Sequence, residues 1–321
     1  MKEFDDKAKQ KLCQRMACIL QPEQILVDEK MSAHTTFRVG GEADIFVEIN
    51  TLKELQEVLA ALRSEGFCEP GRDYHLLGNG SNVLVSDSGI RGIVLHLSKE
   101  YGKIVLDQSD KRTLVCEAGA TLAAVAHSAY ENGLTGFEFA AGIPGSLGGA
   151  IVMNAGAYGG EMRHVVKRVR LMAPDGELVE KNAEEMRFSY RHSILKEEPF
   201  IVVEVAVALA RGSQQEIRAK MEELAARRRE KQPLEYPSAG STFKRPAGHF
   251  AAQLIEEAGL RGFSAGGAQV SEKHCGFIVN KGNATAADIY TLIQEVQKRV
   301  RSSSQVTIEP EVIMLGFGEK G

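Results

Sequence analysis

The chain has 321 residues, of which 43% are hydrophobic and 26% are charged, and its formal net charge is −4. This length predicts about two domains, and the slightly acidic balance argues against nucleic acid as a partner. No apolar run reaches the ~18 residues that a membrane span needs, and residues 1–20 lack the apolar core of a signal peptide. We therefore expect a cytoplasmic protein without a membrane or nucleic-acid partner, and we expect a monomer or a weak oligomer.

The first 133 residues are predicted to contain three helices with strands between them. Residues 1–20 are typical of an amphipathic helix, and residues 35–49 of two short strands joined at Gly40-Gly41. A helix is predicted over 51–66, where apolar residues recur at helical spacing and Gly66 ends the pattern. Another is predicted over 121–133, between Thr121 and Gly133. Five strand-like segments lie between these two helices: 74–78, 82–87, 92–97, 103–107 and 113–119.

The remainder is predicted to group its strands and helices in clusters. Residues 165–181 indicate two strands joined at Pro174-Asp175-Gly176, a turn sequence, and 200–212 a long strand. A helix over 213–233 stops at Pro233, and we place a domain boundary near residue 210. A helix, short strands, a helix over 285–303 and a final strand over 306–316 follow. Clusters in place of strict alternation favour an α+β fold.

Two segments, 76–92 and 142–161, are rich in glycine and poor in charge. Glycine allows the main chain to approach a ligand, and successive amide groups can surround anionic oxygens. Neither segment has the Lys-Ser/Thr ending of a P-loop or the Rossmann spacing. We interpret them as a diphosphate cradle of another kind, and ordinary hairpin turns are the alternative. The scattered cysteines form no C-x-x-C pair and give no support for a metal site.

Five motifs of this chain together resemble the UDP-N-acetylenolpyruvoylglucosamine reductase family, flavoenzymes that complete the peptidoglycan precursor UDP-N-acetylmuramate. They occur in the family's order between about residues 33 and 316. The first two alone also occur in the wider class of FAD domains shared with vanillyl-alcohol oxidase. The motifs are "GNGSNVLVSDSGIRGIVLHL", "GFEFAAGIPGSLGGAIVMNAGAYGGE", "FSYRHSILK", "PSAGSTFKRP" and "IEPEVIMLG".

The resemblance implies an FAD-binding domain of the vanillyl-alcohol-oxidase (PCMH) type in two subdomains, 1–75 and 76–210, with FAD between them. It also implies an α+β substrate-binding domain over 211–321, and it allows the last strand of this domain to return toward the FAD domain. FAD would bind non-covalently, with its pyrophosphate against 78–83 and its flavin along the second glycine-rich segment. NADPH would reduce it. The implied cofactor-binding residues are Arg38, Gly78, Asn79, Gly80, Ser81, Asn82, Val83, Gly142, Ile143, Pro144, Gly145, Gly148, Gly149, Asn154, Ala155 and Gly156.

Reducing an enolpyruvyl ether requires a hydride, a cation that stabilises the developing negative charge, and a proton. By resemblance, Arg191 supplies the cation, Ser241 donates the proton and Glu311 assists it, while Tyr190 contacts the substrate. A surface salt bridge, a turn serine and an exposed strand glutamate are the alternatives for the three catalytic residues. Relatives often carry Arg or Lys where this chain has Ile313, which puts one nearby charged contact in doubt.

The resemblance implies reduction of UDP-N-acetyl-3-O-(1-carboxyvinyl)-glucosamine to UDP-N-acetylmuramate, by the shorter subtype of the family because an extra tyrosine loop is absent. An FAD-dependent alcohol or sugar oxidase is the alternative, and a non-catalytic binding module is a third possibility. Basic residues should hold the substrate's diphosphate, although helix-end and packing roles are alternatives for some. The candidates are Lys231, Lys244, Arg245 and His274.

Overall fold

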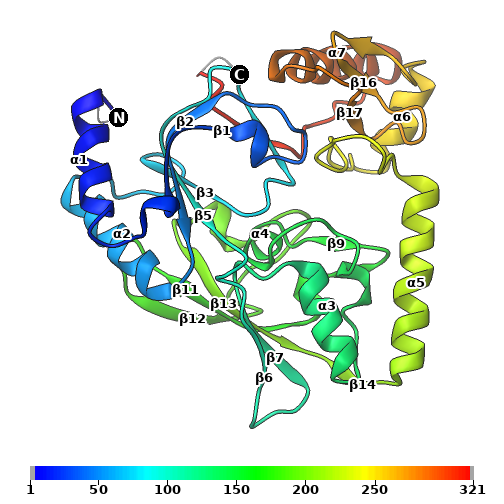
Figure 1. Cartoon of the computed structure of the whole chain (residues 1–321). Coiled ribbons are helices and arrows are strands. Elements are labelled where there is room, and N and C mark those ends of the chain that lie inside the picture. The colour runs from blue at the N-terminus through cyan, green and yellow to red at the C-terminus, as the bar shows by residue number, and fades with distance from the viewer. Residues whose placement is uncertain (1–3, 319–321) are drawn as a thin grey trace. The chain divides into compact units, whose positions relative to one another are not determined.

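The computed structural model describes residues 4–318, which fold into helices and strands that form two compact units (Figure 1). Unit 1 consists of the residues up to Val27 together with Ile45–Gly78 and Gly92–Arg227. Unit 2 consists of Asp28–Asp44, Asn79–Arg91 and the residues from Arg228 onward. Both units are therefore discontinuous in sequence. The division into domains over 1–75, 76–210 and 211–321 that the sequence suggested stays a prediction.

The N-terminal part of unit 1 packs two helices on apolar strand residues. Helix α2 begins after Thr51, whose hydroxyl accepts a hydrogen bond from the Glu54 amide, and it contacts α1. One face of α2 is buried in the same apolar cluster as Ile45, Val47 and Ile49, which share one face of β2. A four-stranded sheet has the order β1-β2-β5-β3. The bounds are α1 Asp6–Met16, α2 Leu52–Ser64, β1 Ile25–Lys30, β2 Glu42–Ile49, β3 Tyr74–Leu77 and β5 Ile90–Leu97.

A five-stranded antiparallel sheet of order β12-β11-β13-β7-β6 forms the rest of the unit 1 core. Helices α3 and α4 lie on one side of it (Figure 1), and α4 contacts β13 and β7. The predicted turn at 174–176 joins β11 and β12, with Gly176 at φ +94°. The bounds are β6 Ile104–Leu106, β7 Thr113–Glu117, α3 Leu122–Glu131, α4 Leu147–Val152, β11 Val166–Met172, β12 Leu178–Asn182 and β13 Ile201–Ala208.

The loops of the chain contain two-residue strands and short 3-10 helices. Strand β8 pairs with β14, and β9 with β10. Their bounds are β8 Leu134–Thr135, β14 Ala210–Arg211, β9 Gly156–Ala157 and β10 Gly160–Glu161, followed by α5 Gln214–Lys231. The 3-10 helices are η1 Pro22–Gln24, η2 Met31–Ala33, η3 Glu138–Ala140, η4 Met162–His164 and η5 Ile194–Lys196.

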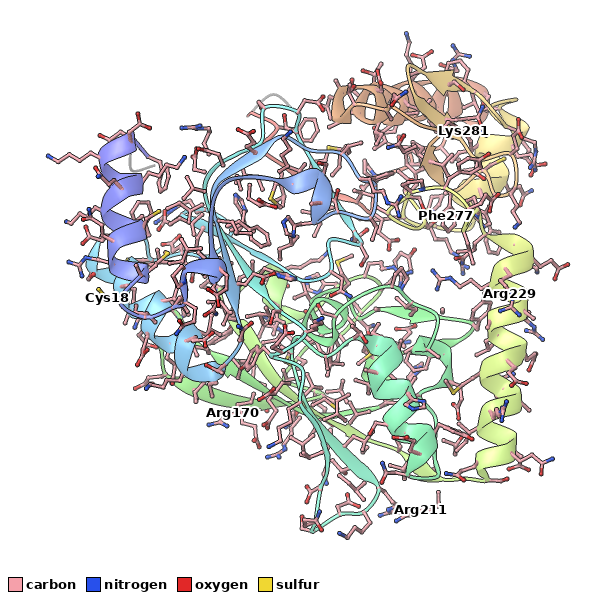
Figure 2. The ribbon with its side chains drawn as sticks, viewed as in Figure 1. Cys18, Arg170, Arg211, Arg229, Phe277 and Lys281 are labelled. Carbon is pink, nitrogen blue, oxygen red and sulfur yellow. The ribbon has the colours of Figure 1, made fainter. Side chains whose placement is uncertain are left out.

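Unit 2 has its own core, in which α7 packs against the sheet β15-β16-β17 and against α6. Phe277 is buried in this unit, whereas Lys281 is exposed (Figure 2). Both carboxylate oxygens of Asp87 accept amide hydrogens at the start of α7, from Ala286 and Ala287, at 2.8 Å each. The bounds are α6 Ala251–Glu257, β15 Ser264–Ala265, β16 Ala268–Val270, β17 Ile278–Asn280 and α7 Ala286–Ser304.

The C-terminal strand β18 (Ile313–Leu315) pairs in parallel with β4 (Val83–Val85), so residues 313–315 lie beside the first glycine-rich segment.

Most predicted helices and strands are confirmed. The strand expected over 35–39 is wrong, because this segment is a loop held by distant contacts, including a hydrogen bond from Asn280 to the Phe37 carbonyl. The final strand is shorter than expected. Within residues 4–318, no helix is long and apolar enough to cross a membrane.

Candidate active site

Tyr190 and Arg191 occupy the tip of a two-residue hairpin in unit 1. Ser189 and His192 exchange two main-chain hydrogen bonds of 3.1 Å across its base. Arg191 has φ +55°, a left-handed conformation that costs a residue with a side chain on the order of 1–2 kcal/mol. Its guanidinium carbon lies 5.2 Å from the centre of the half-exposed Tyr190 ring. The hairpin thus presents a permanent cation beside an aromatic face, a combination suited to a planar anionic group.

Two hydrogen bonds connect this hairpin to the end of α4. The Asn154 side-chain amide donates to the Ser189 carbonyl at 2.9 Å, and the Ser193 hydroxyl donates to the Val152 carbonyl at 2.9 Å. Asn154 and Ser193 are both buried. Sequence reasoning identified Asn154 but missed this contact, because nothing local in the sequence indicates which carbonyl a buried amide will reach.

The second glycine-rich segment uses its amides differently from the expectation. The amide of Gly148 donates to the Ala118 carbonyl at 2.8 Å, and that of Gly149 points to the Ser146 hydroxyl at 3.4 Å. The prediction that these two glycines offer free amides to a ligand is therefore wrong. A Cβ at Gly148 would lie 3.1 Å from the Ala118 Cβ, so glycine allows α4 to pack closely on the end of β7.

The other predicted residues of this segment lie in loops or short strands of unit 1. Gly142, Ile143, Pro144 and Gly145 form the partly exposed link between η3 and α4, and their flavin contact stays a prediction. Ala155 and Gly156 lead into the β9–β10 hairpin. At its tip, Tyr158 and Gly159 have φ +53° and +86°, which is typical of a type I′ turn.

The first glycine-rich loop has the properties expected of an anion cradle. Within residues 4–318, the main-chain amides of Asn79–Asn82 donate no hydrogen bond to another protein group. Four successive amides without acceptors can converge on anionic oxygens. Residues 34–36 fix the conformation of this loop. The Gly80 carbonyl accepts a hydrogen bond from the Thr36 amide at 3.1 Å, and a Cβ atom at Gly80 would collide with the His34 carbonyl. Gly78 directly follows β3, and Val83 begins β4.

Arg38 lies in the loop that supports this cradle. It is exposed between the buried Phe37 and Val39, and its φ of +57° is again left-handed. Its amide donates to the Thr35 carbonyl at 3.1 Å. Arg38, Asn154 and Arg191 are thus three predicted site residues with left-handed main chains, and such strain is concentrated at functional sites.

The segments that carry Ser241 and Glu311 lie side by side in unit 2. Phe243 and Pro310 form an antiparallel bridge, and the Glu311 amide donates to the Thr242 carbonyl at 2.8 Å. The Asn82 side chain donates to the Glu311 carbonyl at 3.2 Å. Ser241 and Glu311 are both half-buried. The structure therefore brings the predicted proton donor, its acidic partner and the first glycine-rich loop together.

Three of the four basic candidates have protein contacts that limit their availability to a ligand. Lys244 pairs with Glu309 at 2.9 Å, and the Arg245 guanidinium carbon lies 4.5 Å from the centre of the Phe250 ring. Lys231 is exposed in the last turn of α5. The His274 Nδ1 atom accepts the Gly276 amide at 3.1 Å, and burial lowers the pKa of its ring, which favours the neutral, packed alternative for this histidine.

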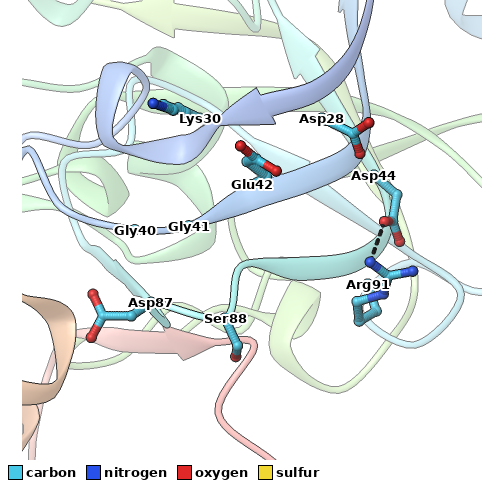
Figure 3. A pocket seen from close by; sticks show the side chains of 9 residues that line it. All are labelled: Asp28, Lys30, Gly40, Gly41, Glu42, Asp44, Asp87, Ser88 and Arg91. Carbon is cyan, nitrogen blue, oxygen red and sulfur yellow. Dashed lines mark ion pairs between the residues drawn. The ribbon is translucent and has the colours of Figure 1, made fainter.

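A cavity of about 270 Å³ in unit 2 contains none of the predicted site residues (Figure 3). Four carboxylates and two cations line it, and the buried Asp44 pairs with Arg91 at 2.7 Å. An acidic lining opposes a diphosphate ligand. Its lining residues are Asp28, Lys30, Gly40, Gly41, Glu42, Asp44, Asp87, Ser88 and Arg91.

Comparisons with known proteins match both parts of the chain. A family model described as an FAD binding domain matches residues 43–182, and one described as the C-terminal domain of UDP-N-acetylenolpyruvoylglucosamine reductase matches residues 232–315. The chain is 48% identical over 305 residues to the reductase of that name from Caldanaerobacter subterraneus subsp. tengcongensis, covering 95% of this chain and 98% of that protein. It is 47% identical over 298 residues to the one from Clostridioides difficile, covering 93% and 95%.

Among solved structures, UDP-N-acetylenolpyruvylglucosamine reductase (MurB) from Thermus caldophilus matches with a TM-score of 0.77 and 34% sequence identity. The match covers 91% of this chain and 99% of that chain.

Proposed function

Because the chain belongs to the UDP-N-acetylenolpyruvoylglucosamine reductase family, we propose that Arg191, Ser241 and Glu311 carry out the reduction at its active site. The chain is an FAD-dependent oxidoreductase of peptidoglycan precursor synthesis. It reduces UDP-N-acetyl-3-O-(1-carboxyvinyl)-glucosamine to UDP-N-acetylmuramate with NADPH as the reductant. The match to the reductase's own C-terminal domain leaves the alcohol or sugar oxidase alternative with less support.

The first glycine-rich loop fits the diphosphate of FAD. Among residues 4–318, its four main-chain amides at 79–82 have no acceptor, and the Gly80 and Asn82 carbonyls already accept main-chain hydrogen bonds from Thr36 and Ile313. We assign the pyrophosphate to these amides, with Arg38 as a further contact, and the flavin to residues 142–145 of the second segment. Bound FAD supplies hydride transfer from NADPH to the enolpyruvyl double bond.

Arg191 binds the substrate's carboxylate in this proposal. A guanidinium can donate two parallel hydrogen bonds to a carboxylate, and its charge does not depend on pH in the working range. Negative charge develops on the carboxylate and the adjacent carbon as the hydride adds, so the fixed cation stabilises the transition state more than the ground state. Tyr190 packs beside the same group.

Ser241 donates the proton that completes the reduction, and Glu311 assists it. A serine hydroxyl is a weak acid and has to be positioned by the site. The observation that carries this assignment is the hydrogen bond from the Glu311 amide to the Thr242 carbonyl, since it holds the serine and glutamate segments side by side. We further propose that the enzyme acts in the cytoplasm as a monomer or weak oligomer, without membrane or nucleic-acid partners.

The test separates the two halves of the reaction in Ser241→Ala. We expect NADPH to reduce the flavin at the wild-type rate, while reoxidation of the reduced flavin by the enolpyruvyl substrate slows by about 10²–10⁴-fold. Ser238→Ala, a half-buried serine of the same loop, is the matched control and should retain both rates. Wild-type reoxidation in Ser241→Ala would remove this serine from the mechanism.

A further inference from the structure

The main chain of Arg191 is held in a conformation that it would not adopt by itself. Its φ of +55° lies in the left-handed region, which residues other than glycine, asparagine and aspartate seldom occupy. Such a conformation persists only where neighbouring groups over-determine it. The hairpin bonds between Ser189 and His192 belong to the turn itself, so further contacts have to fix its place in unit 1.

The Ser189 carbonyl supplies one such contact, because it accepts two hydrogen bonds. One comes from the His192 amide at 3.1 Å and closes the hairpin; the other comes from the Asn154 Nδ2 group at 2.9 Å. A carbonyl oxygen has two lone pairs, and both are used here. Asn154 is only 1% exposed, so this bond is shielded from water. The carbonyl that closes the Arg191 turn is also the one that a buried amide anchors.

Asn154 is itself fixed in one orientation. Its second Nδ2 hydrogen is donated to Glu161 at 2.7 Å, and its Oδ1 atom accepts the Arg163 amide at 3.0 Å. Arg163 also pairs with the Glu161 carboxylate at 3.1 Å. Two acceptors on one side and a donor on the other exclude the flipped amide. A carboxylate at this position would face the Glu161 carboxylate and the Ser189 carbonyl, which it could not satisfy.

A second anchor lies on the other side of Arg191. The hydroxyl of Ser193, a fully buried residue, donates to the Val152 carbonyl at 2.9 Å. Residues 152–154 at the end of α4 therefore hold the chain on both sides of the arginine.

We propose that Asn154 is a positioning residue that fixes the Arg191 hairpin, a role different from the flavin contact that the resemblance implies. This inference rests on the proposed function, since it acts through the guanidinium of Arg191. Asn154 sets where that guanidinium meets the substrate carboxylate, and a displacement of about 1 Å at such a contact can cost roughly a hundredfold in rate.

The experiment measures both half-reactions and FAD affinity in Asn154→Ala and Asn154→Asp. We expect NADPH to reduce the flavin at a rate within about twofold of wild type and the Kd of FAD to be unchanged, while reoxidation by the enolpyruvyl substrate slows about ten- to hundredfold. Asn154→Asp should be at least as slow as Asn154→Ala. The matched control is Asn132→Ala, which loses one 2.8 Å side-chain bond to the Ser128 carbonyl at the end of α3.

A double-mutant cycle with Arg191→Ala tests whether Asn154 acts through the arginine. We expect Asn154→Ala to slow reoxidation no further once the guanidinium is gone, because groups that act as a unit are not additive. A second readout is independent of activity: amide hydrogen exchange at His192, measured on the full chain, should be about tenfold faster in Asn154→Ala and unchanged in Asn132→Ala.

Three results would overturn the inference: equal slowing of both half-reactions with weakened FAD binding, multiplicative effects in the cycle, or wild-type reoxidation in both Asn154 variants. If Asn154→Ala does not fold, Ser193→Ala, which removes the second anchor, has to give the same selective slowing. Failure of the proposed function is distinguishable, because Arg191→Ala alone would then reoxidise at the wild-type rate.

Discussion

Replacing Thr242 with valine is expected to destabilise unit 2 by about 1–3 kcal/mol. Thr242 is 0% exposed, and its hydroxyl accepts the amide of the equally buried Ile278 at 3.0 Å. Valine has nearly the same shape but no acceptor, so the Ile278 amide would be left buried without its partner. An unsatisfied buried donor costs about 1–3 kcal/mol. The change also affects the segment that carries Glu311, because the Thr242 carbonyl accepts a hydrogen bond from the Glu311 amide.

Thermal unfolding followed by far-ultraviolet circular dichroism measures this effect. A chain with units of this size loses about 2–4 °C of Tm per kcal/mol, so a loss of about 2 kcal/mol lowers the midpoint by roughly 4–8 °C. Thr307→Val changes an exposed threonine near Glu311 and should stay within about 0.5 kcal/mol of wild type. If Thr242→Val unfolds at the wild-type temperature, or if both variants shift equally, the reasoning from the buried hydrogen bond is refuted.

Three further changes are predicted from single sites. Asp87→Ala removes both carboxylate acceptors at the start of α7 and should lower the free energy of unfolding by about 1–2 kcal/mol in urea titrations; an unchanged midpoint would contradict this. Tyr158→Asn places a residue that type I′ turns favour at φ +53° and should raise stability by roughly 0.5–1 kcal/mol, whereas a loss would argue against strain at this tyrosine. The hydrogen bond from Arg72 lowers the pKa of Asp73 to about 2, so its carboxylate stabilises the fold above the unfolded pKa of about 3.9 and this contribution is lost as pH falls toward about 2. The urea midpoint of Asp73→Asn should therefore fall less steeply between about pH 4 and about pH 2 than that of the wild type. An equally steep fall in both proteins would exclude this role.

The sequence predicted those elements whose ends are set by their own residues. Helix α2 begins after Thr51, and Gly66 just beyond it has φ +84°, as the composition of the segment indicated. The turn at 174–176 is equally local. The segment over 35–39 looked like a strand but is held by Asn280 and by the Gly80 loop, and contacts so distant in sequence leave no local pattern.

The site divides in the same way. The motifs predict roles for Arg191, Ser241 and Glu311, but they do not indicate the carbonyl that Asn154 binds or the buried hydroxyl of Thr242, the residue after the serine. Only the three-dimensional structure shows these hydrogen bonds. A buried polar side chain nearly always has a hydrogen-bond partner, but the sequence does not specify which group it is. The glycines of the second segment also have a packing role that the sequence does not reveal. Gly148 allows α4 to lie close to the end of β7, and its amide already donates to the Ala118 carbonyl.

The parallel pairing of β4 with β18 has a consequence for how the chain is made. The side chain of Asn82 bonds to a carbonyl 229 residues away, at Glu311. During translation β4 emerges early and stays an unpaired edge until residues 313–315 have also been synthesised, and such edges invite association with other nascent chains. A stop codon placed just before Ile313 should therefore yield aggregated product, even though every element of unit 1 has been synthesised.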